Sequence, residues 1–206
     1  MKEFNRLIEI INDLLGPNGC PWDQKQTLKS IRRHLIEEAY EVIEAINDDD
    51  RDKIVEELGD IFMVVVFLSK LGGKEKGIEI SEILSAINEK LIRRHPHVYG
   101  DAKVETPDEV IRQWENIKQQ EKTERKSKLD GIPKDLPSIL RAQKVCKTFN
   151  KAGHSPSEIP ANDQETEIGL KFYALVKECQ ENGIDADIAL RKVLGHYEQS
   201  FREIES

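Results

Sequence analysis

The spacing of apolar residues is the feature that most limits how this chain can fold. Through most of the 206 residues, apolar side chains recur three or four positions apart, as in Leu7, Ile10, Ile11 and Leu14. This spacing places them on one face of an α-helix. No run of alternating apolar and polar residues bounded by hairpin turns interrupts the pattern. The sequence therefore predicts an all-α fold, a helical bundle.

Turn-forming residues divide this pattern into eight segments. Gly16 to Gly19 ends the first, Asn47 to Asp50 separates the second from the third, Gly72-Gly73 is expected to stop the third, and Thr106-Pro107 resembles a capped helix start. The predicted helices span about 3–15, 25–47, 50–71, 80–94, 107–122, 135–151, 164–182 and 186–204.

A stretch from Gln119 to Asp130 is rich in Lys and Glu and almost free of apolar residues. Such composition is typical of a linker or a solvated helix end. We therefore place a domain boundary near residue 130, which gives a first domain at 1–130 and a second at 131–206.

The charge balance bears on the class of ligand. Thirty-one basic and 39 acidic residues give a formal net charge of -8, which argues against a protein that binds a nucleic acid polymer through a basic face. A small anionic ligand would need a metal ion or a local basic cluster to offset repulsion.

Cysteine content and apolar run length bear on location. The three cysteines, Cys20, Cys146 and Cys179, do not have the spacing of a disulfide framework or a zinc site. The longest apolar run, Ile61 to Leu68, is too short to span a membrane. We therefore expect a cytoplasmic protein with free thiols and no membrane contact.

Two acidic pairs on consecutive predicted helices carry the chemistry. Glu38 and Glu41 form one pair and Glu57 and Asp60 the other, each spaced i, i+3, so that both carboxylates of a pair project from one helix face. The short connection at 47–50 makes the two helices antiparallel neighbours. The four carboxylates are therefore expected to converge.

Four converging carboxylates repel one another unless a cation lies between them. Oxygen ligands without histidine favour Mg²⁺ or Mn²⁺ over zinc or a ferritin-like di-iron site. The alternative is that these are solvated faces of charged helices, since 34% of the residues are charged. Glu57 and Asp60, however, lead directly into the apolar run 61–68, which is expected to be deeply buried, and acids there need a partner.

The sequence also resembles a known family. Glu37-Glu38-x-x-Glu41, followed after fifteen residues by Glu57-x-x-Asp60, is similar to the signature of the MazG-type nucleoside triphosphate pyrophosphohydrolases. Three further motifs share the resemblance: Cys20-Pro21-Trp22-Asp23-x-x-Gln26-Thr27, Arg93-Arg94-His95-Pro96-His97-Val98-Tyr99 and Trp114-x-x-Ile117-Lys118.

The resemblance implies an all-α homodimer that hydrolyses nucleoside triphosphates between the α and β phosphates. Carried over residue by residue, Glu38, Glu41, Glu57 and Asp60 would be Mg²⁺ ligands, and Glu37 would position or deprotonate the attacking water. The residues that would bind the nucleotide are Lys53, Arg93, Arg94 and Trp114.

Each of these binding residues has an ordinary structural alternative. Lys53 has the spacing of a salt bridge with Glu57, and Arg93 and Arg94 suit the C-terminus of a helix. Trp114 would then be a packed aromatic side chain.

The second half of the chain repeats part of the first without its charges. Residues 57–62 align with residues 167–172 at a constant offset, but Leu170 stands where Asp60 stands, and nothing upstream of Glu167 repeats the other acids. We therefore predict that the first domain is catalytic and the second is a degenerate copy that serves packing or dimerisation.

Two alternatives stay open at this point. One is a relative specific for a single nucleotide, such as dCTP, dUTP or phosphoribosyl-ATP. The other is a helical interaction or regulatory protein without catalysis, whose acidic pairs are solvated and whose 61–68 segment forms an oligomer interface. The sequence contains neither a glycine-rich phosphate loop nor a serine nucleophile elbow.

Overall fold

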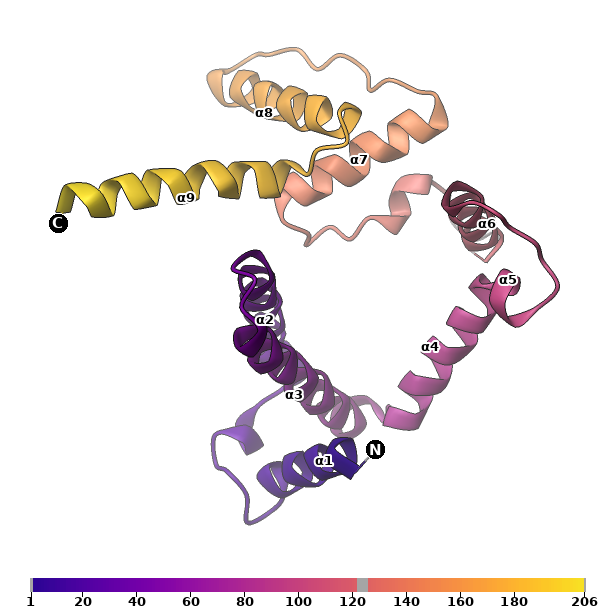
Figure 1. The fold of residues 1–206 in the computed structure, drawn as a ribbon, viewed down its shortest axis with the longest axis vertical. Helices are drawn as coiled ribbons and strands as arrows, with labels where there is room; N and C mark the ends of the chain where they lie inside the picture. The colour runs from indigo at the N-terminus through magenta and orange to yellow at the C-terminus, as the bar shows by residue number, and fades with distance from the viewer. Residues whose placement is uncertain (1, 122–125, 206) are drawn as a thin grey trace. The chain divides into compact units, whose positions relative to one another are not determined.

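The computed structural model describes residues 2–121 and 126–205, and all regular elements there are helices (Figure 1). The all-α prediction is confirmed. The first elements are α1 (Lys2–Leu15), η1 (Asp23–Lys25), α2 (Leu28–Asn47), α3 (Arg51–Lys76), α4 (Ile80–Arg94), α5 (Pro96–Tyr99) and α6 (Pro107–Gln120). They are followed by η2 (Lys128–Gly131), α7 (Ser138–Ala152), α8 (Gln164–Glu181) and α9 (Ala186–Glu205).

The chain forms two compact units, Met1–Lys118 and Gln119–Ser206. The break lies before the position near residue 130 that the composition indicated, because the short helix η2 packs against α7 and so belongs to the second unit. Residues 122–125 of the predicted linker lie outside the described residues.

Helices α2 and α3 form the antiparallel hairpin on which the first unit is built (Figure 1). Thr27 caps α2 in a reciprocal pair of hydrogen bonds with Ser30, and the Asp50 carboxylate caps α3 by accepting from two backbone N–H groups. At the open end of the hairpin, the backbone N–H of Leu28 donates to Glu75 Oε1 at 2.8 Å. The short turn and this bond fix the register of the two helices at both ends.

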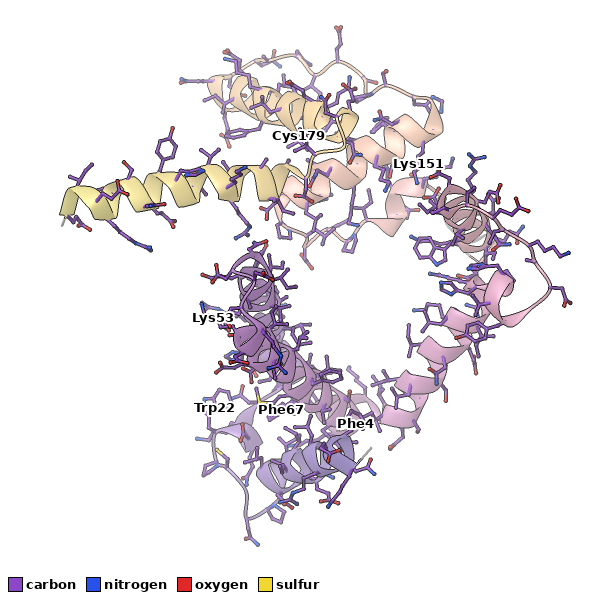
Figure 2. All side chains as sticks on the ribbon, in the orientation of Figure 1. Phe4, Trp22, Lys53, Phe67, Lys151 and Cys179 are labelled. Atoms are coloured by element: carbon purple, nitrogen blue, oxygen red, sulfur yellow. The ribbon has the colours of Figure 1, made fainter. Side chains whose placement is uncertain are left out.

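Helix α1 covers the far end of α3 and completes a small core. The buried residues of this core are Ile11, Ile31, Val64, Val66, Phe67 and Leu71. Phe4 of α1 packs against the group that contains Phe67, and both are labelled in Figure 2. Full burial of an apolar side chain of this size contributes about 1.5–3 kcal/mol to the free energy of unfolding. The hairpin therefore has a stable base on which to hold polar groups at its other end.

The connection between α1 and α2 is tightly folded. The backbone N–H of Cys20 donates to the Leu14 carbonyl, and Gln24 Nε2 donates to the Gly16 carbonyl at 2.6 Å. A Cβ atom at Gly19 would lie 2.2 Å from the carbonyl oxygens of both Asp13 and Leu14, so the close approach of the backbone requires glycine there. The segment before α2 is thus anchored to α1.

Helix α3 is longer than predicted, because Gly72-Gly73 does not end it. The helix continues to Lys76 and ends at Gly77, whose φ of 66° is the left-handed conformation of a C-terminal cap. Ile78 folds back so that its side chain approaches Gly72 and its carbonyl approaches Gly73. The two glycines therefore provide room for the returning chain instead of a stop.

The prediction that the 61–68 segment is deeply buried on every side is wrong for part of it. Val64, Val66 and Phe67 are buried, whereas Phe62 and Val65 are 56% and 44% exposed. Among the described residues of the first unit, α1 and α2 pack on one side of α3 and leave Phe62 and Val65 on a more exposed side, here called the uncovered face.

The second unit contains α7, α8 and α9, with α7 packed against both others. Cys146, Val176 and Ala186 are buried between them. Burial and the neighbouring Cys146 thiol raise the pKa of Tyr173 to about 12. Among the described residues, every helix of the chain falls short of the length and apolar character that a membrane crossing requires.

Candidate active site

The α2–α3 hairpin brings acidic side chains together near its turn. Glu41 and Glu57 each lie eight residues from Asp49 in the turn, and Glu38 and Asp60 each lie eleven residues from it. Positions equally distant from the turn of an antiparallel helical hairpin lie opposite one another. The sequence positions of the four acids therefore decide that they meet across the hairpin.

Three of these carboxylates form one group. Oxygen atoms of Glu38, Glu41 and Glu57 all lie within 4.8 Å of one another, and among the described residues this is the one group of three or more possible metal ligands. Asp60 lies outside that distance, but its charge acts on both Glu38 and Glu57. An all-oxygen group of this size can hold a hard divalent cation, because opposite ligands of Mg²⁺ are about 4.2 Å apart at about 2.1 Å from the ion.

The carboxylates of this group repel one another. Partial burial and then the charges of Glu41, Asp60 and Glu57 raise the pKa of Glu38 above its ordinary value. Partial burial and then Glu41, with smaller contributions from Glu56 and Asp60, raise the pKa of Glu57. Both shifts mean that the ionised forms are disfavoured where they stand. A cation at this position would reverse the effect.

These shifts predict how stability depends on pH. Without a metal ion, folded Glu38 and Glu57 retain protons that the unfolded chain has already released, so the free energy of unfolding should fall as the pH rises above 4.5, their ordinary pKa. Urea unfolding followed by circular dichroism from pH 4.5 towards neutrality measures the slope. A Glu38→Gln, Glu57→Gln double variant should show a smaller decline, and saturating Mg²⁺ should also reduce it. Equal slopes for both proteins would contradict the assignment.

Glu37, the predicted catalytic residue, lies beside this group and not in it. Its Oε1 accepts a hydrogen bond from Arg33 Nε at 2.8 Å, and its Oε2 lies 3.2 Å from His34 Nδ1. Both partners are on α2, one turn before Glu37. The carboxylate is thus held at the edge of the acidic group by basic side chains of its own helix.

Lys53 is on the first turn of α3, where Figure 2 labels it, and its amine donates to Asp48 Oδ2 at 3.1 Å. The contact is with the turn of the hairpin and not with Glu57, the salt-bridge partner that the spacing offered. The hydrogen bond and the charge of Asp48 raise the pKa of Lys53. Both side chains are about half exposed, so this ion pair is weak, and a more highly charged anion can take the place of Asp48 as the partner of Lys53.

Arg94 and Trp114 form a second group in the first unit. The guanidinium of Arg94, at the end of α4, lies 5.4 Å from the centre of the Trp114 ring on α6. The Lys118 amine lies 4.9 Å from the same ring centre. Both distances are typical of cation–π contacts. Arg93 is exposed on the last turn of α4. Two cations are therefore held on one aromatic side chain.

The structure brings Glu38, Glu41 and Glu57 together in one group and Arg94 with Trp114 in another. Among the described residues, α6 does not pack against α2 or α3. His34 and Lys118 were not selected from the sequence as site residues. Helical spacing was the available signal, because His34 is three residues before Glu37 and Lys118 is four residues after Trp114.

Comparison with known proteins places this hairpin in a family. Residues 26–99 match the model of the MazG nucleotide pyrophosphohydrolase domain. A nucleoside triphosphate pyrophosphohydrolase of Escherichia coli K12 is 36% identical over the whole chain, which covers 88% of that protein. A relative from Thermotoga maritima, named nucleoside triphosphate pyrophosphohydrolase/pyrophosphatase MazG, is 34% identical over the whole chain and 88% of its own length.

Two other relatives extend the comparison. The uncharacterised YabN of Bacillus subtilis is 45% identical over 70% of this chain, which spans 30% of that longer protein. The crystal structure of a mazG-related protein from Thermotoga maritima matches with a TM-score of 0.50 and 28% identity, over 56% of this chain and 98% of that one. The match of residues 26–99 contains all the acidic residues of the hairpin, and the chain belongs to the MazG nucleotide pyrophosphohydrolase family.

Proposed function

We propose that this protein hydrolyses nucleoside triphosphates between the α and β phosphates, giving a nucleoside monophosphate and pyrophosphate, with Mg²⁺ as cofactor and broad specificity for the base. The convergence of Glu38, Glu41 and Glu57 on one hairpin is the observation that carries the proposal. The names of the Escherichia coli and Thermotoga maritima relatives support the reaction.

Glu38, Glu41, Glu57 and Asp60 are the proposed Mg²⁺ ligands, with Mn²⁺ as a substitute. The donor set consists of oxygen alone, which suits these hard cations, and the raised pKa values of Glu38 and Glu57 indicate a need for positive charge. When bound, the ion supplies charge against the phosphate oxygens and acidifies nearby water. Asp60 would join through a change of side-chain rotamer, since it stands one turn beyond Glu57 on the same face.

Glu37 is the proposed base. Its carboxylate accepts the proton that the attacking water releases as the new oxygen–phosphorus bond forms, while the bond to the bridging oxygen breaks and pyrophosphate leaves. Arg93 and Arg94 provide planar donors for phosphate oxygens, and Lys53 exchanges Asp48 for the triphosphate. Trp114 is the proposed platform that holds Arg94 towards the nucleotide.

We also propose that the chain acts as a homodimer. The uncovered face of α3 presents exposed apolar side chains; exposed apolar patches mark interaction surfaces, and most soluble oligomers are symmetric assemblies of one chain. The second unit, without a second acidic group among its described residues, would serve packing or dimerisation. Action on small nucleotides in the cytoplasm, without a nucleic acid polymer or a membrane as partner, stays a prediction.

Product analysis tests the proposed reaction. The purified protein is incubated with a panel of standard and modified triphosphates, with and without Mg²⁺, and the products are separated by ion-exchange chromatography. We expect monophosphate and pyrophosphate in equal amounts, only in the presence of the metal ion. Diphosphate and inorganic phosphate would contradict the position of cleavage. Hydrolysis of one nucleotide alone would indicate a narrow-specificity relative, and no turnover would favour a protein without catalysis.

A further inference from the structure

We infer that His34, held in place by Trp22, is a positioning residue that directs the Glu37 carboxylate towards water and keeps it out of the metal-ligand group. The inference rests on the proposed function, in which Glu37 is the base. It also gives a role to the Cys-Pro-Trp-Asp segment before α2, which the proposed function does not use.

His34 lies on the same face of α2 as the acids. Its position, three residues before Glu37 and seven before Glu41, continues the i, i+3, i+7 stripe that carries them. His34 Nδ1 is 3.2 Å from Glu37 Oε2, and the two side chains are 42% and 41% exposed. The histidine is therefore the next side chain along the face that we propose binds metal and phosphate.

Trp22, which is 56% exposed, contacts the other side of His34. The two rings meet edge to face, with centroids 6.1 Å apart and an interplanar angle of 70°. The backbone of Trp22 is held in place by two side chains. Gln26 Nε2 donates to the Trp22 carbonyl at 3.0 Å, and Gln24 Nε2 donates to the Gly16 carbonyl in the same segment. Figure 2 shows Trp22 on this connection between α1 and α2. His34 is thus in contact with a segment outside α2.

A base next to metal ligands needs such a restraint. Glu37 is adjacent to Glu38 in sequence, and a free carboxylate there would be drawn to the same cation. A carboxylate that coordinates the ion shares its lone pairs with it and is a weaker base. Glu37 is absent from the group formed by Glu38, Glu41 and Glu57, and its carboxylate lies instead against Arg33 and His34.

Arg33 also contacts Glu37 but is less suited to this role. Its side chain is 84% exposed, and an exposed i, i+4 pair of this kind contributes little and exchanges readily. The imidazole of His34 has two rotatable bonds and packs against Trp22, so less freedom is lost when it holds the carboxylate. Arg33 therefore offers a matched control, on the same helix and with the same carboxylate.

Steady-state kinetics with a nucleoside triphosphate and Mg²⁺ provide the first test. His34→Leu should lower kcat about tenfold or more and leave KM within about twofold, because the misplaced base affects the chemical step and not substrate binding. His34→Asn should recover most of the loss, since the asparagine Nδ2 takes the position of Nδ1. Trp22→Leu should lower kcat in the same way, and Arg33→Ala, which removes the exposed donor to the other oxygen of Glu37, should lower kcat less than His34→Leu does. A loss through KM alone, or no recovery with asparagine, would overturn the inference.

The second test does not depend on activity. Nitrogen-15 NMR of the intact protein, at a pH where His34 is neutral, reports which ring nitrogen carries the proton. We expect the Nδ1–H form of His34 in the wild type and the Nε2–H form in Glu37→Ala. An Nε2–H form in the wild type would overturn the inference even if the protein hydrolyses nucleotides. A wild-type protein without turnover would overturn the proposed function, while the tautomer would still decide the contact between His34 and Glu37.

Discussion

Glu57→Gln and Glu38→Gln should each lower kcat by about a thousandfold or more, with the fold intact. Glutamine keeps the shape of each side chain but removes the negative charge, so the site would lose most of its affinity for Mg²⁺ and the charge stabilisation that depends on it. Without metal, both variants should be at least as stable as the wild type, because each removes a carboxylate whose pKa its neighbours raise. Activity assays across a Mg²⁺ titration, paired with urea unfolding, measure both effects.

Glu56→Gln is the matched control for Glu57→Gln. Glu56 is the adjacent residue on α3, is exposed, and lies outside the group of possible ligands. Its activity should stay within about threefold of the wild type. An Asp60→Ala variant examines the fourth proposed ligand. If that variant remains active, the ligand set is reduced to the three residues that lie together, and if Glu57→Gln remains active the metal site itself is wrong.

Phe62→Glu should dissociate the proposed homodimer. Phe62 is 56% exposed in the single chain and belongs to the uncovered face of α3. The other exposed apolar residues of this helix are Val55, Leu58, Met63 and Val65. A charge at the centre of a buried apolar interface commonly costs 2 kcal/mol or more, which corresponds to an increase of about thirtyfold or more in the dissociation constant. Sedimentation velocity over a range of protein concentrations measures the shift from dimer to monomer.

Ile159→Glu is the control for this change. Ile159 is 60% exposed and lies in the connection between α7 and α8, outside the face in question. The same substitution there should leave the sedimentation unchanged. A wild-type chain that sediments as a monomer at micromolar concentration would contradict the proposed assembly, and a Phe62→Glu dimer would place the interface elsewhere.

The helical spacing of the sequence determined much of the first unit. Local signals set the first residues of α2 and α3, since Thr27 and Asp50 cap these helices with bonds to the next few residues. The convergence of Glu38, Glu41 and Glu57 also followed from sequence, because a three-residue turn fixes which positions of the two helices lie opposite each other. Spacing along one chain was sufficient wherever the partners are on one helix or on two helices joined by a short turn.

Only the tertiary structure decided the contacts between segments without such a constraint. The exposure of Phe62 depends on which side of α3 the other helices cover, and the course of α3 through Gly72 depends on where Ile78 returns. The approach of Trp22 to His34 depends on how the connection folds against α1. Each of these is a packing choice between elements, and the periodicity of a single helix carries no information about which neighbour will cover it.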